Sequence, residues 1–155
     1  MALVDLLWSL VLITAPSVLI SGPRSLRDGK RRRLFLLAIA AGLGSAALWF
    51  SWSPDRSVLE VFRLGMSNQL SWWQVLACGF TLIAANTALA VRYVHRADQV
   101  RALAAGLATG FASSYCISDA ITSNPQAGIG ALMAYVGTLV CALVFNCLLY
   151  ACLRL

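Results

Sequence analysis

Four polar residues between two long apolar stretches are the first candidates for chemistry in this sequence. They are Ser114, Tyr115, Ser118 and Asp119. Tyr115 and Asp119 stand four positions apart, so on a helix they lie on one face and can share a hydrogen bond. They are a thin basis for acid–base catalysis, because a catalytic acid or base must be positioned against a reacting group. We therefore interpret the four residues as a candidate polar site near the outer membrane edge, without a catalytic role.

No other arrangement of reactive residues is typical of an enzyme. The single histidine, His95, stands beside Arg96 in a basic stretch. No C-x-x-C motif is present, and no cysteine pairs with the histidine at zinc-ligand spacing. The five cysteines, all in or near apolar stretches, are Cys78, Cys116, Cys141, Cys147 and Cys152. The sequence therefore indicates a non-enzymatic protein without a metal site or cofactor.

The composition is that of a membrane protein. Hydrophobic residues make up 60% of the chain and charged residues 12%, whereas soluble domains carry about 25% charged residues. The apolar residues form long uncharged runs, which is the pattern of transmembrane helices. The net charge of +6 comes from residues gathered between those runs. This placement indicates a role in membrane topology and argues against nucleic-acid binding.

Five apolar stretches have about the 20 residues that a helix needs to cross a bilayer. None shows the alternating pattern of a membrane β-strand. The predicted fold is therefore a single all-α integral membrane domain over residues 1–155, a bundle of five transmembrane helices. The predicted spans are 2–21, 34–52, 72–91, 102–121 and 125–153.

The distribution of basic residues predicts the orientation of these spans. With five crossings, ten of the twelve Lys and Arg residues lie on one side, and only Arg56 and Arg63 lie on the other. The side rich in basic residues is expected to be cytoplasmic, so the N-terminus lies outside and the C-terminus inside. The alternative has four spans, with the fourth stretch re-entrant or interfacial. That alternative leaves irregular backbone at membrane depth, which needs cover from protein or water.

The only long connection, between the second and third spans, predicts a short amphipathic helix over residues 54–66. Ser53 can cap this helix and Pro54 suits its first position. Its apolar side is expected to lie in the outer membrane interface. Tryptophans such as Trp49 and Trp73 flank it, as is common at interfaces. We interpret the segment as a membrane anchor.

Three uncharged polar residues are predicted to share one layer inside the membrane. Counted from the nearest basic flank, Asn86, Thr109 and Asn146 lie about 9 to 12 Å deep at 1.5 Å per residue. Amides in lipid hydrogen-bond across helices. We therefore predict an Asn86–Asn146 contact, either direct or through Thr109. We interpret this contact as a stabilising link between helices. The alternative is a polar track for a solute.

Gly106 and Gly110 form a G-x-x-x-G motif in the fourth span. This spacing lets two helix backbones approach closely. The partner helix is either another span of this chain or the same span of a second copy, and the motif favours neither.

These features together favour an accessory protein of the cell membrane. The loops are mostly short and no soluble domain is present, which is typical of an assembly, stabilising or immunity-type subunit that binds a larger membrane protein. The alternative is a small oligomeric transporter or channel with a pathway between protomers, and a membrane enzyme comes third. The expected partners are the lipid bilayer and either another membrane protein or a second copy. Because arginine far outnumbers lysine, we expect a multi-pass protein of a bacterial cytoplasmic membrane.

Overall fold

The computed structural model describes residues 2–22, 28–51, 71–122 and 127–154, and within these ranges the chain is all-helical without a strand. The predicted all-α bundle is therefore confirmed over the described residues. The predicted amphipathic helix over 54–66 lies outside them. The helices are α1 (Ala2–Ser21), α2 (Gly29–Phe50), α4 (Trp72–Tyr93), α5 (Ala97–Thr122) and α6 (Ala127–Arg154).

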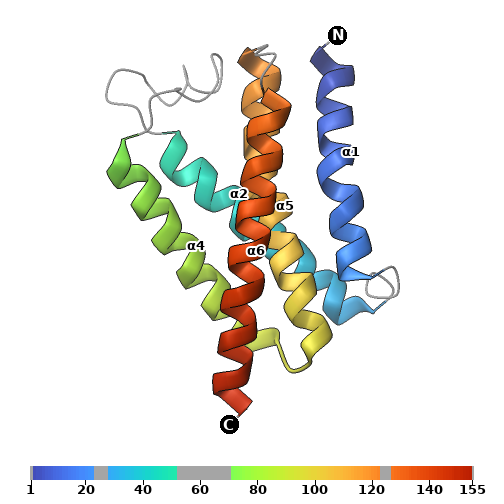
Figure 1. The fold of residues 1–155 in the computed structure, drawn as a ribbon, viewed down its shortest axis with the longest axis vertical. Helices are drawn as coiled ribbons and strands as arrows, with labels where there is room; N and C mark the ends of the chain where they lie inside the picture. The colour runs from blue at the N-terminus through green and yellow to red at the C-terminus, as the bar shows by residue number, and fades with distance from the viewer. Residues whose placement is uncertain (1, 23–27, 52–70, 123–126, 155) are drawn as a thin grey trace.

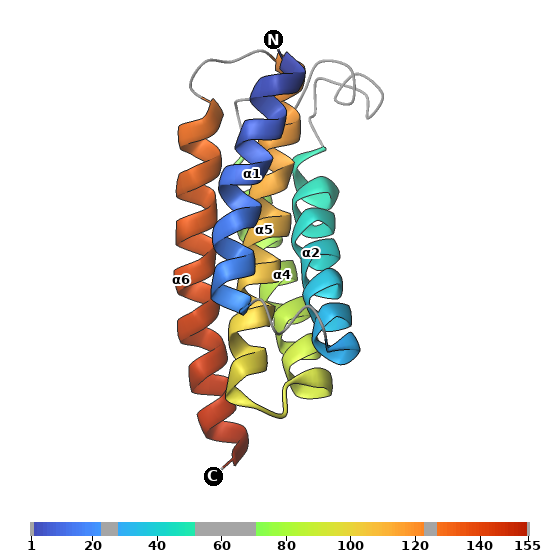
Figure 2. The same ribbon diagram turned by 90° about the vertical axis from the view of Figure 1, so that its right-hand side faces the viewer.

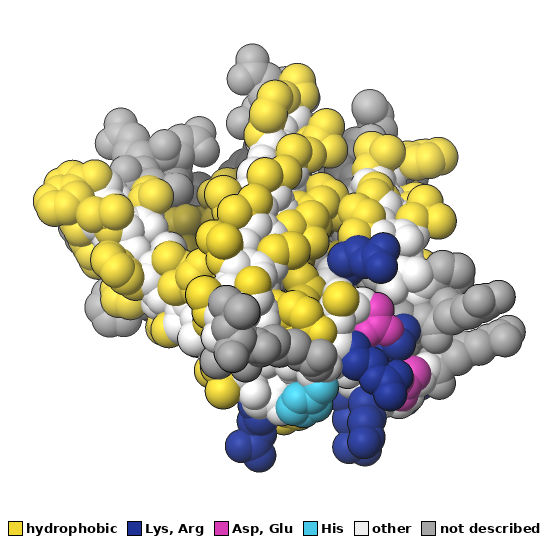
Figure 3. Space-filling model, turned by 60° about the horizontal axis from the view of Figure 1, so that its bottom comes forward, with side chains coloured by type: hydrophobic (Ala, Val, Ile, Leu, Met, Phe, Trp, Pro, Cys, Tyr) yellow, Lys and Arg dark blue, Asp and Glu magenta, His cyan; other side chains and the backbone are white. Residues whose placement is uncertain are grey.

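Four of these helices, α2, α4, α5 and α6, are each long and apolar enough to cross a membrane. In α1, the described apolar stretch Leu10–Ser21 is shorter. Large apolar side chains are exposed along the sides of the helices, and the basic residues gather at one end (Figure 3). Such a surface is unfavourable in water and suits the hydrocarbon of a bilayer. The fold therefore supports a multi-pass membrane protein.

The helices extend beyond their apolar cores, and local capping determines where they begin and end. Asp28 caps α2 by accepting a hydrogen bond from the Lys30 backbone at 3.1 Å, so α2 begins before the predicted start at Leu34. α1 ends at Ser21 because Gly22 adopts a φ of 84°, a left-handed conformation that suits glycine. In α2 the charged first turn is thus added to the apolar stretch that hydropathy marks.

Helix α5 occupies the middle of the bundle. Helices α1, α2 and α6 surround it, and α4 lies outside against α2 (Figures 1 and 2). The segment 102–110 of α5 is buried at every position, because its mostly small side chains let neighbours approach on all sides. α5 is also one continuous helix of 26 residues. It contains no break at which the re-entrant segment of the four-span alternative could turn.

The G-x-x-x-G motif of α5 packs against α2 inside the bundle. A Cβ atom added to Gly106 would lie 2.7 Å from the Ala38 Cβ and 2.8 Å from the Phe35 carbonyl oxygen. A Cβ on Gly110 would overlap the α2 backbone, and Gly42 of α2 meets the α5 backbone in the same way. Glycine is therefore required on both helices for this approach, and α2 is the helix that the motif contacts.

Candidate functional site

The predicted contact between Asn86 and Asn146 is present, and it is direct. Each side-chain amide donates to the other across 3.0 Å, which joins α4 to α6. The two residues are only 4% and 2% exposed. This reciprocal arrangement, called the amide pair below, satisfies a donor and an acceptor on each side chain. Such pairing lowers the cost of placing amides in hydrocarbon.

Thr109 does not share the layer of the amide pair. Its hydroxyl lies 2.5 Å from the Ser17 hydroxyl of α1, which in turn lies 2.8 Å from the Tyr135 hydroxyl of α6. Tyr135 precedes Asn146 by eleven residues on α6, or roughly 16 Å along the helix. Depth counted from the basic flanks misplaced Thr109, because the C-terminal part of α6 extends past the first residues of α5 (Figure 2).

Ser17, Thr109 and Tyr135 form a buried hydroxyl cluster that joins three helices. The Ser17 hydroxyl donates to the Ile13 carbonyl oxygen at 2.8 Å, so its own hydrogen is used. It accepts from Thr109 and can accept from Tyr135, which uses both of its lone pairs. Ser17 is therefore the centre of the cluster. Sequence reasoning missed this role, although Ser17 lies seven residues before Arg24 and thus at a depth of roughly 10 Å, similar to that of Thr109.

A third group of polar contacts joins α2 to α4. The Trp49 indole N–H donates to the Thr81 hydroxyl at 2.8 Å. The Gln74 amide donates to the Trp49 carbonyl oxygen at 3.0 Å, and its own oxygen accepts from the Ser71 backbone at 3.0 Å. Trp49 also packs edge-on against Trp73 at 6.2 Å between ring centroids. The interfacial tryptophan of the sequence analysis thus has a specific hydrogen-bonding role.

The four residues proposed as an outer polar site lie in the C-terminal part of α5. Ser114 and Ser118 are buried, and the Ser114 hydroxyl donates to a carbonyl of its own helix at 2.6 Å. The Tyr115 ring packs edge-on against Phe50 of α2 with centroids 6.1 Å apart. Asp119 lies within α5, and its side chain is outside the described part. Ser114, Tyr115 and Ser118 therefore face the bundle. There Ser114 hydrogen-bonds its own helix and Tyr115 packs against Phe50.

A groove of about 400 Å³ opens between α4 and α6 on one side of the amide pair. The two helices approach each other near the C-terminal end of α6 and diverge toward the opposite end of the bundle (Figure 1). Gly79 and Gly137 line the groove from opposite helices, and neither has an atom within 4 Å of the position that a Cβ would occupy. The remaining lining residues are Leu82, Ile83, Asn86, Leu107, Thr138, Cys141, Ala142 and Phe145. The volume lies in the usual range for binding pockets, which is about 300–1,000 Å³.

A smaller pocket of about 240 Å³ lies on the other side of the amide pair, at the basic end of the bundle. We call it the end pocket. Asn146 contributes to its wall, whereas Asn86 contributes to the groove, so the pair separates the two spaces. The other residues of the end pocket are Ala90, Val91, Val94, His95, Leu149 and Tyr150.

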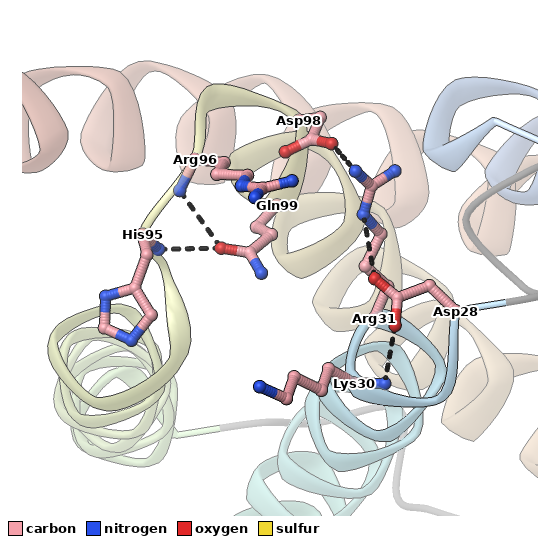
Figure 4. A network of polar contacts seen from close by, with 7 residues as sticks. All are labelled: Asp28, Lys30, Arg31, His95, Arg96, Asp98 and Gln99. Carbon is pink, nitrogen blue, oxygen red and sulfur yellow. Dashed lines mark hydrogen bonds and ion pairs between the residues drawn. The ribbon is translucent and has the colours of Figure 1, made fainter.

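Charged and polar contacts organise the loop ends beside this pocket (Figure 4). Arg31 of α2 forms an ion pair with Asp98 of α5. The Gln99 side-chain oxygen accepts hydrogen bonds from the backbone N–H groups of His95 at 2.7 Å and Arg96 at 3.1 Å. These contacts fix the turn between α4 and α5 and attach the start of α2 to it.

The described residues contain no group of three His, Cys, Asp or Glu side chains that could hold a metal ion. All five cysteines are free thiols, with Cys78 and Cys116 buried and the other three exposed. Comparison with protein families, with curated proteins and with solved structures found no match to this chain. The candidate functional features of the described residues are therefore the amide pair, the hydroxyl cluster, the groove and the end pocket.

Proposed function

We propose that the chain crosses the membrane five times, with its N-terminus outside and its C-terminus in the cytoplasm of a bacterial cell. Two observations support this orientation: α1 begins and α6 ends at opposite ends of the bundle (Figure 1), and basic residues gather at the end where α6 finishes (Figure 3). Basic loops stay on the cytoplasmic side. Reporter fusions at the two termini test the proposal, because five crossings place them on opposite sides and four place them together.

Within that membrane, the function we propose is that of a non-enzymatic accessory subunit whose groove receives a transmembrane helix of a larger partner. The bare glycines Gly79 and Gly137, which face one groove from two helices, carry this proposal. Helices in lipid associate by close packing at small residues, because hydrocarbon supplies no hydrophobic drive between them. Exposed glycine backbone offers this close approach to another helix. An acyl chain, in contrast, gains little from it.

The packing inside the bundle favours a docking role at its outer surface and argues against a reaction site in its interior. The segment 102–110 of α5 is entirely buried, which leaves little space for a substrate along the central axis. The buried polar groups of the amide pair and the hydroxyl cluster bond one another across helices. Polar residues used in this way stabilise a bundle. The groove between α4 and α6 is then the place that we assign to a partner.

A pull-down in mild detergent with a matched pair of glycine variants tests this function. Gly137→Leu fills the groove, whereas Gly130→Leu adds the same side chain to the same helix at an open position outside the groove lining. We expect a stoichiometric partner that copurifies with the wild type and with Gly130→Leu and is lost from Gly137→Leu. If both variants retain the partner, or the wild type has none, the docking function is refuted.

A small oligomeric transporter is the second candidate, and the two spaces on either side of the amide pair favour it. A pathway along the α4–α6 surface between protomers would pass from the groove to the end pocket, with Asn86 and Asn146 at the narrow point. Ion flux into liposomes tests this candidate. We expect flux above that of protein-free liposomes and a changed rate in Asn86→Ala. Liposomes that stay tight with wild-type protein would exclude an ion pathway.

A further inference from the structure

The end pocket between α4 and α6 has an apolar interior and a polar rim. Ala90, Val91 and Leu149 supply apolar walls, while His95 and Tyr150 contribute polar groups. Its residues come from the last turn of α4, from Val94 and His95 just after that helix, and from the C-terminal part of α6. In a chain that spans the membrane these segments lie where hydrocarbon meets the head groups. The pocket thus combines two environments over a short distance, as a lipid molecule does.

Cations surround this end of the bundle. Arg96 directly follows His95, and Arg92 precedes His95 by about one helical turn. Both arginines are exposed, and among the described residues neither forms a salt bridge. Of the arginines that the structure describes at this end, Arg31 alone has carboxylate partners. The blue side chains of Figure 3 show this surface, with the histidine beside it. The rim therefore attracts an anion, and arginine offers the N–H geometry that phosphate oxygens prefer.

We infer that the end pocket is a binding site for an anionic phospholipid, whose phosphate contacts Arg92 and Arg96 and whose acyl chain enters between Val91 and Leu149. Charge complementarity selects an anionic head group over a zwitterionic one. The apolar interior selects a lipid over an acidic peptide, because a peptide would meet the cations and leave the pocket unfilled. The site is separate from the groove, so it stands independently of the partner proposed for that groove.

Lipid retention by the full-length chain tests this site. The protein is reconstituted into vesicles of equal phosphatidylglycerol and phosphatidylcholine and extracted in mild detergent, and the lipid that copurifies is quantified by mass spectrometry. We expect phosphatidylglycerol to be enriched over phosphatidylcholine. Each cation near a membrane surface contributes roughly fivefold to anionic lipid binding. Arg92→Gln with Arg96→Gln should therefore lower the enrichment by at least about tenfold.

The matched control removes the same charge elsewhere on this end of the bundle. Arg32 and Arg33 are also exposed, and their helix α2 contributes no residue to the pocket. Arg92 and Arg96, in contrast, directly follow the lining residues Val91 and His95. The double glutamine variant of Arg32 and Arg33 should lower the enrichment less than about threefold, because only the diffuse attraction of the surface changes. Equal losses in the two double variants would show diffuse attraction without a site and would overturn the inference, as would a wild type without enrichment.

A second pair of variants tests entry of the acyl chain. Val91→Trp fills the end pocket from a position that is 57% exposed, and Val75→Trp makes the same change on α4 at a position that is 50% exposed and outside the pocket. Helical circular dichroism reports whether each variant is folded. We expect Val91→Trp to lose phosphatidylglycerol and Val75→Trp to keep it. Retention by folded Val91→Trp would refute the pocket as the site.

Discussion

Replacing Ser17 by alanine should destabilise the bundle more than replacing either of its hydroxyl partners. Ser17 accepts from Thr109 and, in the arrangement that its geometry favours, from Tyr135. Without Ser17, the Thr109 hydroxyl can donate its one hydrogen to the Ala105 carbonyl oxygen, which lies 2.7 Å away. Tyr135 is only 3% exposed, and its hydroxyl then loses the partner that Ser17 provides. The cost of Ser17→Ala therefore includes a buried donor without an acceptor.

The expected magnitudes follow from that difference. An interhelical hydrogen bond in a membrane protein contributes about 0.6 kcal/mol on average and up to about 1.7 kcal/mol. Tyr135→Phe removes one such bond together with its donor, so we expect a loss near the average of about 0.6 kcal/mol. Ser17→Ala leaves the tyrosine donor unsatisfied, which costs about 1–3 kcal/mol. In the Tyr135→Phe background no donor is stranded, so the same serine substitution should cost about 1 kcal/mol less.

A double-mutant cycle measures these values. Unfolding of the wild type, Ser17→Ala, Tyr135→Phe and the double variant in mixed micelles gives four free energies of unfolding. Thr14→Ala is the matched control, because the Thr14 hydroxyl is exposed on the same helix and bonds only the Leu10 carbonyl oxygen at 2.7 Å. The free energy of unfolding of the Thr14→Ala variant should equal that of the wild type. Additive losses in the cycle, or a Ser17→Ala variant as stable as Tyr135→Phe, would refute the proposed role of Ser17.

Three further substitutions follow from the same structure. Asn86→Leu should cost about 1–3 kcal/mol by stranding a buried amide, and adding Asn146→Leu should recover part of that loss in the same unfolding assay. Gly110→Ala should lower the free energy of unfolding by about 1–3 kcal/mol, because the added Cβ would overlap the α2 backbone. Gly44→Ala should be neutral, because its Cβ would meet no atom within 4 Å. Equal melting temperatures of the two variants would contradict this prediction. Gln74→Leu should lower the melting temperature by releasing the α2–α4 contact, and an unchanged value would speak against that contact.

The sequence was sufficient to predict the helices and one tertiary contact. Long uncharged runs can bury their backbone groups in lipid only as helices or closed barrels, and no run had the alternation of a barrel strand. The contact between Asn86 and Asn146 followed because an amide in hydrocarbon requires a partner, and only a few amides were available. The ends of α2 were less predictable, because a charged first turn such as that after Asp28 is invisible to hydropathy.

Hydroxyl contacts could not be predicted in the same way. A serine or threonine in a helix can bond the carbonyl four residues earlier, as Ser17 bonds Ile13 and Thr109 bonds Ala105. Its hydroxyl is then satisfied within its own helix, so the sequence contains no requirement for a partner. Only the packing of α1, α5 and α6 brings Tyr135 to Ser17.

The same distinction holds for the glycines. A G-x-x-x-G motif indicates that two helix backbones can approach closely, but it does not identify the partner helix. The packing of the bundle assigns Gly106 and Gly110 to α2 and leaves Gly79 and Gly137 facing a groove. The sequence by itself determined that the chain forms apolar helices and that its amides must pair, because both follow from the cost of polar groups in hydrocarbon. Tertiary structure alone decided which small residues are used inside the bundle and which remain open, because a glycine has no side chain whose chemistry could specify its neighbour.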